Sequence, residues 1–193
     1  LPAVFHRGEG VWLWDVEGRR YLDMMSAYSA VSFGHAHPRL VRALTDQAQR
    51  LALTSRAFSS DRLPVFLERL CATFGYERAL PVNTGLEAVE TALKAARKWG
   101  YKVKGIAPER ARIIACDGNF HGRSIAIVGL SANEHYRDGF GPFPPGLERV
   151  PYGDADALEA AITPDTAAFL VEPIQGEGGI VVPPPGYLSR CAE

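Results

Sequence analysis

The segment Thr84-Gly85-Leu86-Glu87 could start a helix and hold an anion at that start. A threonine hydroxyl with a glutamate three residues later has the spacing of a capping box. Glycine lets backbone amides come close to an anion, and the unpaired amides of a first helical turn favour a phosphate. An ordinary helix start is the alternative, and these four residues alone favour it. No Gly-Lys-Ser/Thr follows, which argues against a nucleotide triphosphatase.

A second group of candidate residues lies in Asn119-Phe-His-Gly-Arg123. Phe120 could stack on a flat ligand ring from this glycine-bounded loop. Arg123 carries a planar guanidinium that suits a carboxylate. His121 could titrate near neutral pH, although a loop histidine is more often a polar contact than a catalytic base. The alternative is an ordinary turn with a core phenylalanine and a surface arginine.

Two further pairs of residues are weaker candidates. Glu172 and Glu177 could act as paired carboxylates, but the Pro-Ile-Gln-Gly between them gives no basis for the separation that glycosidases use. His35 and His37 could ligate a metal, but metal sites need further ligands, and no cysteine or carboxylate cluster accompanies this pair. We therefore expect structural carboxylates and no metal site.

No lysine in the sequence has the features of a buried amine nucleophile. All of them lie in or just after one predicted helix, whose apolar residues point the other way. They are expected to form a solvated stripe of Lys94, Lys98, Lys102 and Lys104. The sequence therefore indicates binding residues and no catalytic residue.

The length of 193 residues, or 21.0 kDa, suits one ordinary domain or part of a larger one. A formal charge of −1 leaves no field to gather nucleic acid or an anionic membrane. No apolar run approaches the ~20 residues of a membrane crossing, and the N-terminus shows no secretory pattern. Three widely spaced cysteines suit reduced thiols, so we expect a cytoplasmic location.

The elements that must position these residues change character near residue 78. Before it, the pattern predicts a hairpin, over 11–15 and 20–23, and two amphipathic helices, over 38–52 and 61–75. After it, short apolar runs alternate with helices, which is the rhythm of an α/β protein with a largely parallel sheet. The predicted strands are 79–82, 112–116, 124–130 and 167–171, and the predicted helices are 85–99 and 154–162.

The predicted sheet should bring the candidate residues to one edge. In open α/β sheets, ligands bind outside the carboxyl ends of the strands, where helix N-termini also point. Predicted strands end in 83–85, 117–123 and 172–179. We therefore expect these stretches along a shared edge, which forms the candidate binding site.

A series of longer motifs runs along nearly the whole sequence, in order and without large gaps. They are Ser26-Ala-Tyr-Ser-Ala-Val31, Gly34-His-Ala-His-Pro38, Leu53-Thr-Ser-Arg-Ala-Phe58, Asn83-Thr-Gly-Leu-Glu-Ala-Val-Glu-Thr-Ala92, Ala96-Arg-Lys-Trp-Gly-Tyr101, Asn119-Phe-His-Gly-Arg123, Asp138-Gly-Phe-Gly-Pro142 and Val171-Glu-Pro-Ile-Gln-Gly-Glu177. Together they resemble the ornithine aminotransferases, which are class III, fold type I enzymes that use pyridoxal 5′-phosphate. The last two motifs are shared with acetylornithine and 4-aminobutyrate aminotransferases.

The resemblance implies a set of cofactor-binding residues. Amides of the first helical turn, with a threonine beside them, would hold the phosphate, and an aromatic ring would stack on the pyridine. A glutamate would form part of the wall of the same site. These cofactor residues are Thr84, Gly85, Leu86, Phe120, His121 and Glu172.

The resemblance also implies how substrates are held. Tyr28 and Arg123 match residues that bind the substrate α-carboxylate and direct the distal amine of ornithine to the cofactor. Glu177 matches a carboxylate that masks a second arginine, which is freed when 2-oxoglutarate binds. Ser59 stands where the family often has an aromatic or histidine side chain that shapes the ornithine pocket. An acetylornithine or other ω-amino-acid aminotransferase is therefore the alternative within the class.

The implied reaction is a ping-pong transfer of the distal amino group of L-ornithine to 2-oxoglutarate, giving glutamate 5-semialdehyde and glutamate. The family's Schiff-base lysine and the aspartate for the pyridine nitrogen follow the region matched here, so we expect this chain alone to be inactive. The absent initiator methionine and an unfinished helix after Gly186 also indicate that both ends continue. A non-catalytic scaffold that lost the lysine is the alternative of another class.

The expected organisation follows from the same resemblance. Residues 1–58 would form an N-terminal segment, and residues 59–193 would form the first part of the large cofactor-binding domain. Members of the family are dimers or larger, with sites at the subunit interface. We therefore expect a homodimer or a higher homo-oligomer.

Overall fold

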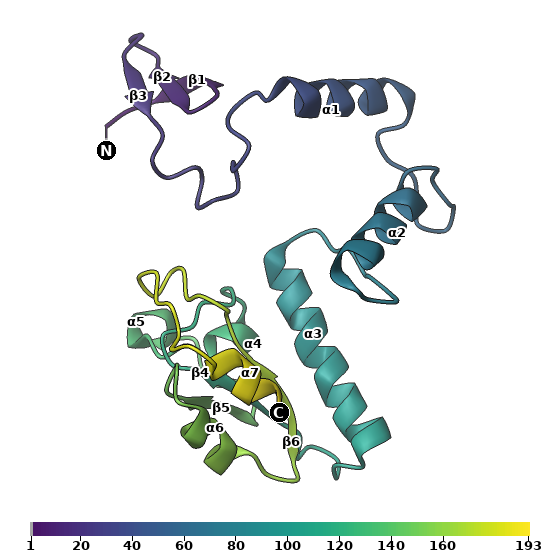
Figure 1. The fold of residues 1–193 in the computed structure, drawn as a ribbon, viewed down its shortest axis with the longest axis vertical. Coiled ribbons are helices and arrows are strands. Elements are labelled where there is room, and N and C mark those ends of the chain that lie inside the picture. Colours follow the sequence, from purple (N-terminus) through teal and green to yellow (C-terminus); the bar gives the residue numbers. More distant parts are fainter. Residues whose placement is uncertain (1) are drawn as a thin grey trace. The chain divides into compact units, whose positions relative to one another are not determined.

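The computed structural model describes residues 2–193, which form two compact units on either side of the Ala79–Leu80 bond. Each unit has its own secondary structure (Figure 1). A domain boundary between residues 58 and 59 stays a prediction for the complete protein. In residues 2–193, no helix is both long and apolar enough to cross a membrane.

The first unit begins with a small antiparallel sheet in the order β1-β2-β3. The predicted hairpin is confirmed as β2 (Trp12–Asp15) and β3 (Arg20–Leu22), and it pairs with a further strand that was not predicted, β1 (Phe5–Glu9). Asp15 stabilises the hairpin turn, because its buried carboxylate accepts the Arg19 amide at 2.9 Å and the Tyr21 hydroxyl at 2.9 Å.

Two helices complete this unit, as the sequence predicted. They are α1 (Pro38–Arg50) and α2 (Leu63–Phe74). Each has a proline in its first turn, where the missing amide hydrogen costs no intrahelical bond. Gly75 ends α2 in a left-handed conformation with φ of +72°, which is the role expected of a glycine after a helix.

The second unit is built around a fully parallel sheet in the order β5-β4-β6. The strands are β4 (Arg112–Cys116), β5 (Leu147–Val150) and β6 (Thr166–Leu170). The helices are α3 (Gly85–Trp99), which continues into the π-helical turn η1 (Gly100–Lys104), α4 (Ile125–Val128), α5 (Glu134–Arg137), α6 (Ala155–Ala161) and α7 (Tyr187–Ala192).

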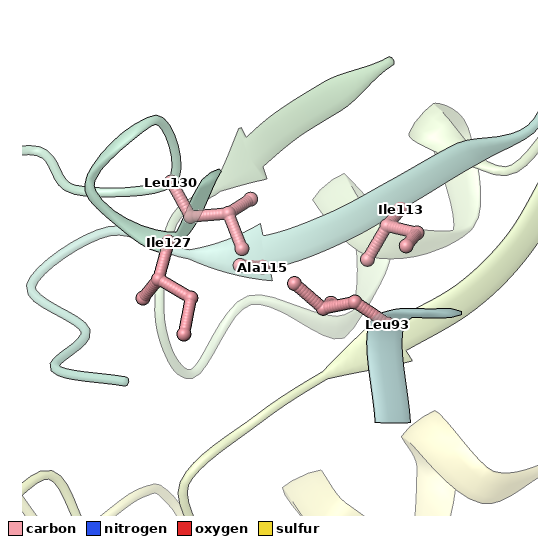
Figure 2. Close-up of a cluster of buried hydrophobic side chains, with 5 residues drawn as sticks. All are labelled: Leu93, Ile113, Ala115, Ile127 and Leu130. Atoms are coloured by element: carbon pink, nitrogen blue, oxygen red, sulfur yellow. The ribbon is translucent and has the colours of Figure 1, made fainter. Parts of the chain in front are cut away.

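Alternate residues of β4 enter two hydrophobic clusters on opposite faces of the sheet. Ile113 and Ala115 pack with Leu93 of α3, Ile127 of α4 and Leu130 (Figure 2). Ile114 packs on the other face with Val150 of β5 and Leu158 of α6. A strand buried on both faces is typical of a parallel sheet covered by helices. The predicted α/β class with a mostly parallel sheet is therefore confirmed.

Two predicted strands are wrong. Residues 79–82 have no regular structure, and Pro81 lacks the amide hydrogen that a central strand donates. Residues 124–130 contain α4 instead of a strand, because the Ser124 hydroxyl accepts the Ile127 amide and caps a short helix. A short apolar run is equally compatible with a buried strand and a buried helical turn. β5 was not predicted, because its two charged residues hide its apolar character.

Candidate active site

The start of α3 has the capping box that its sequence predicted. The Thr84 hydroxyl accepts the Glu87 amide at 3.1 Å, and the Glu87 carboxylate accepts the Asn83 amide at 2.6 Å. The bond from the Asn83 amide, with a further bond from its side chain, lowers the pKa of Glu87 and keeps the carboxylate charged. The amides of Gly85 and Leu86 have no acceptor within the helix. No atom lies within 4 Å of the position that a Gly85 side chain would take, so the helix start is open on that side.

A second polar segment follows β4 and is tied to the segment after β6. The Phe120 amide donates to Glu172 Oε1 at 2.8 Å, and the Gly176 amide lies 3.3 Å from Glu172 Oε2. The Tyr152 hydroxyl lies 3.0 Å from the carbonyl oxygens of both Glu172 and Pro173. Glu172 therefore joins two loops at the carboxyl ends of neighbouring parallel strands.

Two amides that the sequence analysis did not select complete this tie. The buried Gln175 side chain donates to the Asp117 carbonyl at 2.7 Å. Asn119 Nδ2 donates to the carbonyls of Cys116 and Leu130, at 2.5 and 2.8 Å. Both residues belong to the quoted motifs, but only the fold shows which backbone groups they satisfy.

The loop after β4 also lies directly against the start of α3. Gly122 has a φ of +129°, and a side chain there would come within 2.6 Å of Leu86 Cδ1. Two residues further, the Ser124 hydroxyl hydrogen-bonds to the Glu90 carboxylate of α3. The expected meeting of 117–123 with 172–179 is therefore confirmed, and 117–123 also meets the first turn of α3 directly after 83–85, although no strand precedes α3.

Phe120 and Arg123 lie close together in this loop. The Arg123 guanidinium carbon is 5.6 Å from the centre of the Phe120 ring, which also meets the ring of Tyr136 edge-on at 6.5 Å. Arg123 is exposed and makes no ion pair within residues 2–193. It lines a pocket of about 550 Å³ with Ile125, Val128, His135, Tyr136, Asp138 and Phe140. A guanidinium with no carboxylate partner in this part of the chain can receive an anion.

His121 is half-buried, and its surroundings favour the uncharged imidazole. Burial lowers the pKa of His121, and the negative charge of Glu172 offsets only part of that effect. Its Nε2 atom is buried and has no hydrogen-bond partner among the described residues. A buried polar atom without a partner is costly, so this nitrogen is available to a group that the described residues do not include.

The structure does not test the roles of two predicted substrate residues. Glu177 is exposed and has no hydrogen bond or ion pair within residues 2–193. Tyr28 belongs to the first unit, where its side chain is 81 % exposed. Its backbone is left-handed, with a φ of +55°. Their roles stay predictions.

Within residues 2–193, the cluster thus combines helix amides without an acceptor in the helix, an aromatic ring, a histidine of lowered pKa and a guanidinium without an ion-pair partner, at the end of a parallel sheet. The family model described as aminotransferase class-III matches residues 1–193. The chain belongs to the class III aminotransferases.

Two similar curated proteins have the same name. The chain is 56 % identical over 193 residues to an ornithine aminotransferase of Brevibacillus brevis, covering 100 % of this chain and 48 % of that protein. It is 57 % identical over 192 residues to an ornithine aminotransferase of Bacillus subtilis, again covering 100 % of the chain and 48 % of the relative. The chain therefore spans about half the length of the curated relatives it matches.

Two solved aminotransferase structures also match the whole chain. The ornithine aminotransferase of Toxoplasma gondii ME49 matches with a TM-score of 0.97 at 48 % identity, over 100 % of this chain and 46 % of that one. The acetylornithine aminotransferase of Elizabethkingia anophelis matches with a TM-score of 0.82 at 46 % identity, over 100 % of this chain and 44 % of that one. The fold type I architecture of these aminotransferases is the architecture of this chain, as its motifs implied.

Proposed function

We propose that the complete protein transfers the distal amino group of L-ornithine to 2-oxoglutarate, with pyridoxal 5′-phosphate as cofactor. The products are glutamate 5-semialdehyde and glutamate. The observation that supports this proposal is the close approach of the Gly122 backbone to the Leu86 side chain, because it brings the Phe120 loop beside the first turn of α3. The name shared by the similar curated proteins supports ornithine as the amino donor.

The residues of the cluster fit the cofactor. A phosphate would be held by the amides of Gly85 and Leu86, at a helix start where the side-chain position of Gly85 is open. Phe120 would cover one face of the pyridine ring, and Nε2 of His121, which has no partner within residues 2–193, would meet one of its polar groups. In a structure of the Toxoplasma gondii ornithine aminotransferase, pyridoxal phosphate partly occupies the active site of that protein.

Pyridoxal phosphate supplies an electron sink when bound, and the residues of this chain supply binding and orientation. Thr84 and Glu87 keep the helix start ordered by capping each other's segment. Glu172 keeps the Phe120 backbone fixed through its amide. The low pKa of His121, a result of its burial, keeps the ring uncharged, so it adds no positive charge to the site.

Substrate binding in this proposal depends on Arg123, Tyr28 and Glu177. The Arg123 guanidinium would bind the substrate α-carboxylate with charge-assisted hydrogen bonds, helped by the Tyr28 hydroxyl. The distal amine of ornithine would then point toward the cofactor. Glu177 would mask a second arginine until 2-oxoglutarate binds. A homodimer or larger assembly and a cytoplasmic location belong to the same proposal.

The second candidate is an acetylornithine or other ω-amino-acid aminotransferase. The Elizabethkingia structure favours it, since that acetylornithine aminotransferase is 46 % identical to the chain. Ser59 also favours it, because a smaller side chain leaves more room for an acetylated or different donor.

A substrate comparison with the complete protein separates these functions. L-ornithine, N-acetylornithine and 4-aminobutyrate would each be assayed with 2-oxoglutarate, and we expect the highest kcat/KM for L-ornithine. No consumption of L-ornithine would overturn the proposal, and a preference for N-acetylornithine would favour the second candidate.

A variant tests the proposed substrate residue. Arg123→Ala should raise the KM for L-ornithine, because a charge-assisted hydrogen bond is worth ~1.5–3 kcal/mol, or roughly ten- to a hundredfold. Arg110→Ala is a matched control, since Arg110 pairs with Asp165 away from the cluster and its loss should leave KM unchanged. An unchanged KM in Arg123→Ala would remove Arg123 from the substrate site.

A further inference from the structure

A histidine–aspartate contact closes a loop of the first unit. His35 Nε2 lies 2.7 Å from Asp23 Oδ2, and the two side chains are only 21 % and 10 % exposed. The hydrogen bond with His35 lowers the pKa of Asp23. The residues between them form a loop whose two ends are joined by this contact, as in an Ω-loop.

The second carboxylate oxygen of Asp23 organises the start of the same loop. Asp23 Oδ1 accepts the amide of Met25 at 3.0 Å and the amide of Ser26 at 2.8 Å. The Asp23 amide in turn donates to the Val11 carbonyl at 2.9 Å, which anchors the residue to the sheet. Asp23 therefore connects the sheet, the histidine and the first residues of the loop.

The segment that Asp23 holds has an unusual backbone. Ser26, Ala27, Tyr28 and Ser29 are all left-handed, with φ of 47°, 47°, 55° and 69°. Residues with a Cβ atom adopt this conformation rarely and singly, because Cβ crowds the following carbonyl oxygen. Four in succession persist only where the surrounding structure holds them, and such segments concentrate at functional sites. The loop closes on itself through the bond from the Val31 amide to the Ser26 carbonyl at 3.0 Å.

His35 is itself fixed in place by glycines. Its backbone exchanges two hydrogen bonds with Gly10, at 2.9 and 2.8 Å. A side chain at Gly8 would come within 2.7 Å of His35 Cγ, and one at Gly34 would meet the Gly10 carbonyl oxygen at 3.0 Å. The imidazole thus occupies space that only glycine leaves free, which fixes the direction of its Nε2 atom.

We propose that Asp23 and His35 are positioning residues, which hold the left-handed turn and thereby place Tyr28 for substrate binding. This inference rests on the proposed substrate role of Tyr28. Neither residue of the pair touches substrate in this arrangement. Asp23 acts on Tyr28 through the amides that precede it, and His35 acts through Asp23.

The test uses the complete, cofactor-loaded protein and steady-state kinetics with L-ornithine at saturating 2-oxoglutarate. Asp23→Ala and His35→Ala should raise the KM for L-ornithine about three- to tenfold, the worth of one misplaced hydrogen bond, while kcat stays within about twofold. Asp23→Asn keeps an acceptor for the two amides, and His35→Gln keeps a donor for Asp23. Both conservative variants should restore most of the loss.

Asp15→Ala is the matched control for a merely structural effect. Asp15 is a buried carboxylate of the same sheet that also accepts backbone amides, but its partners are Glu17, Arg19 and Tyr21. It should lower the Tm of the protein and leave KM unchanged. A double variant of Asp23→Ala with Tyr28→Phe should raise KM no further than the larger single effect, because both act on one contact.

The remaining outcomes separate the positioning role of Asp23 and His35 from the substrate role of Tyr28. If Tyr28→Phe raises KM while Asp23→Asn, His35→Gln and both alanine variants lower Tm alone, the positioning role is overturned and the substrate role of Tyr28 stands. If Tyr28→Phe leaves KM unchanged, Tyr28 is not a substrate residue and the positioning role falls with it. Turnover of L-ornithine by the unmodified protein would then still support the rest of the proposed function. Where an alanine variant cannot be purified, His35→Leu, which removes the contact with Asp23, should show faster hydrogen exchange of the 25–31 amides, and unchanged exchange would overturn the inference.

Discussion

The start of α3 and the loop after β4 lie against each other, but different kinds of contact hold them. Thr84 and Glu87 cap the helix through partners at most four residues away. The loop depends on Glu172, which is 52 residues from Phe120, and on Gln175, which is 58 residues from Asp117. The helix start is therefore a local structure, whereas the loop depends on partners that the pairing of β4 with β6 brings near.

This difference predicts how strongly each region responds to substitution. A local cap contributes its own hydrogen bond and little else, so its loss should act mainly on the helix start. A loop held by distant partners responds to any change that moves β4, β6 or α3. Substitutions in the loop are thus expected to have larger effects than substitutions in the cap.

The largest effect is expected from Gly122→Ala. Its backbone conformation is essentially restricted to glycine, which costs about 1–3 kcal/mol for other residues, and the added methyl group must displace Leu86 Cδ1 from a distance of 2.6 Å. Chemical denaturation of the complete protein should show a loss of stability, and the cofactor should bind more weakly because Leu86 belongs to its proposed phosphate site.

Gly105→Ala is the control that isolates the close contact. Gly105 also has a positive φ, +83°, but nothing lies within 4 Å of the added side chain. Its loss of stability should be only the backbone penalty of about 1–2 kcal/mol. Equal losses in both variants would show that the loop does not press on the start of α3.

The comparison also shows which parts of the fold the sequence could predict. The helices 38–52, 61–75, 85–99 and 154–162 have apolar residues at helical spacing with recognisable ends, and all four are present. The strands 112–116 and 167–171 are buried runs bounded by polar residues, and they are present within one residue. The failures at 79–82 and 124–130 are short runs, for which periodicity cannot separate strand from helix.

The candidate site likewise contains features that the sequence could predict and features that it could not. The cap of α3 was predictable because Thr84 and Glu87 stand at the spacing of a capping box. The role of Glu172 as a bridge between loops was not, since nothing near it in sequence indicates that its partner is the Phe120 amide. The buried Gln175 and the left-handed turn around Tyr28 were missed for the same reason, because both depend on contacts or backbone angles that residue types alone do not specify.

A smaller effect is expected from Thr84→Ala, which removes the hydroxyl that caps the start of α3. Loss of a helix cap of this type costs about 1 kcal/mol, within a range of roughly 0.5–2. Thr84→Ser keeps the hydroxyl that accepts the Glu87 amide and should keep most of that stability. Thermal or chemical unfolding of the complete protein measures both variants. A larger loss in Thr84→Ala than in Gly122→Ala would contradict the ranking of local and distant contacts.

The smallest effect is expected from acid, acting on His121 in the loop. Burial lowers the pKa of the folded imidazole, whereas the unfolded one takes up a proton near its ordinary value of about 6.5. Above that pH both states are neutral and stability does not change through this group. As pH falls below it, the unfolded state binds more protons and the free energy of unfolding decreases, until the folded imidazole is protonated as well. The free energy of unfolding would be measured as a function of pH in two variants. Its decrease below pH ~6.5 through this histidine should be absent in His121→Gln and retained in His135→Gln, which changes an exposed histidine. An identical slope in both variants would show that His121 is not protected from protonation by the loop.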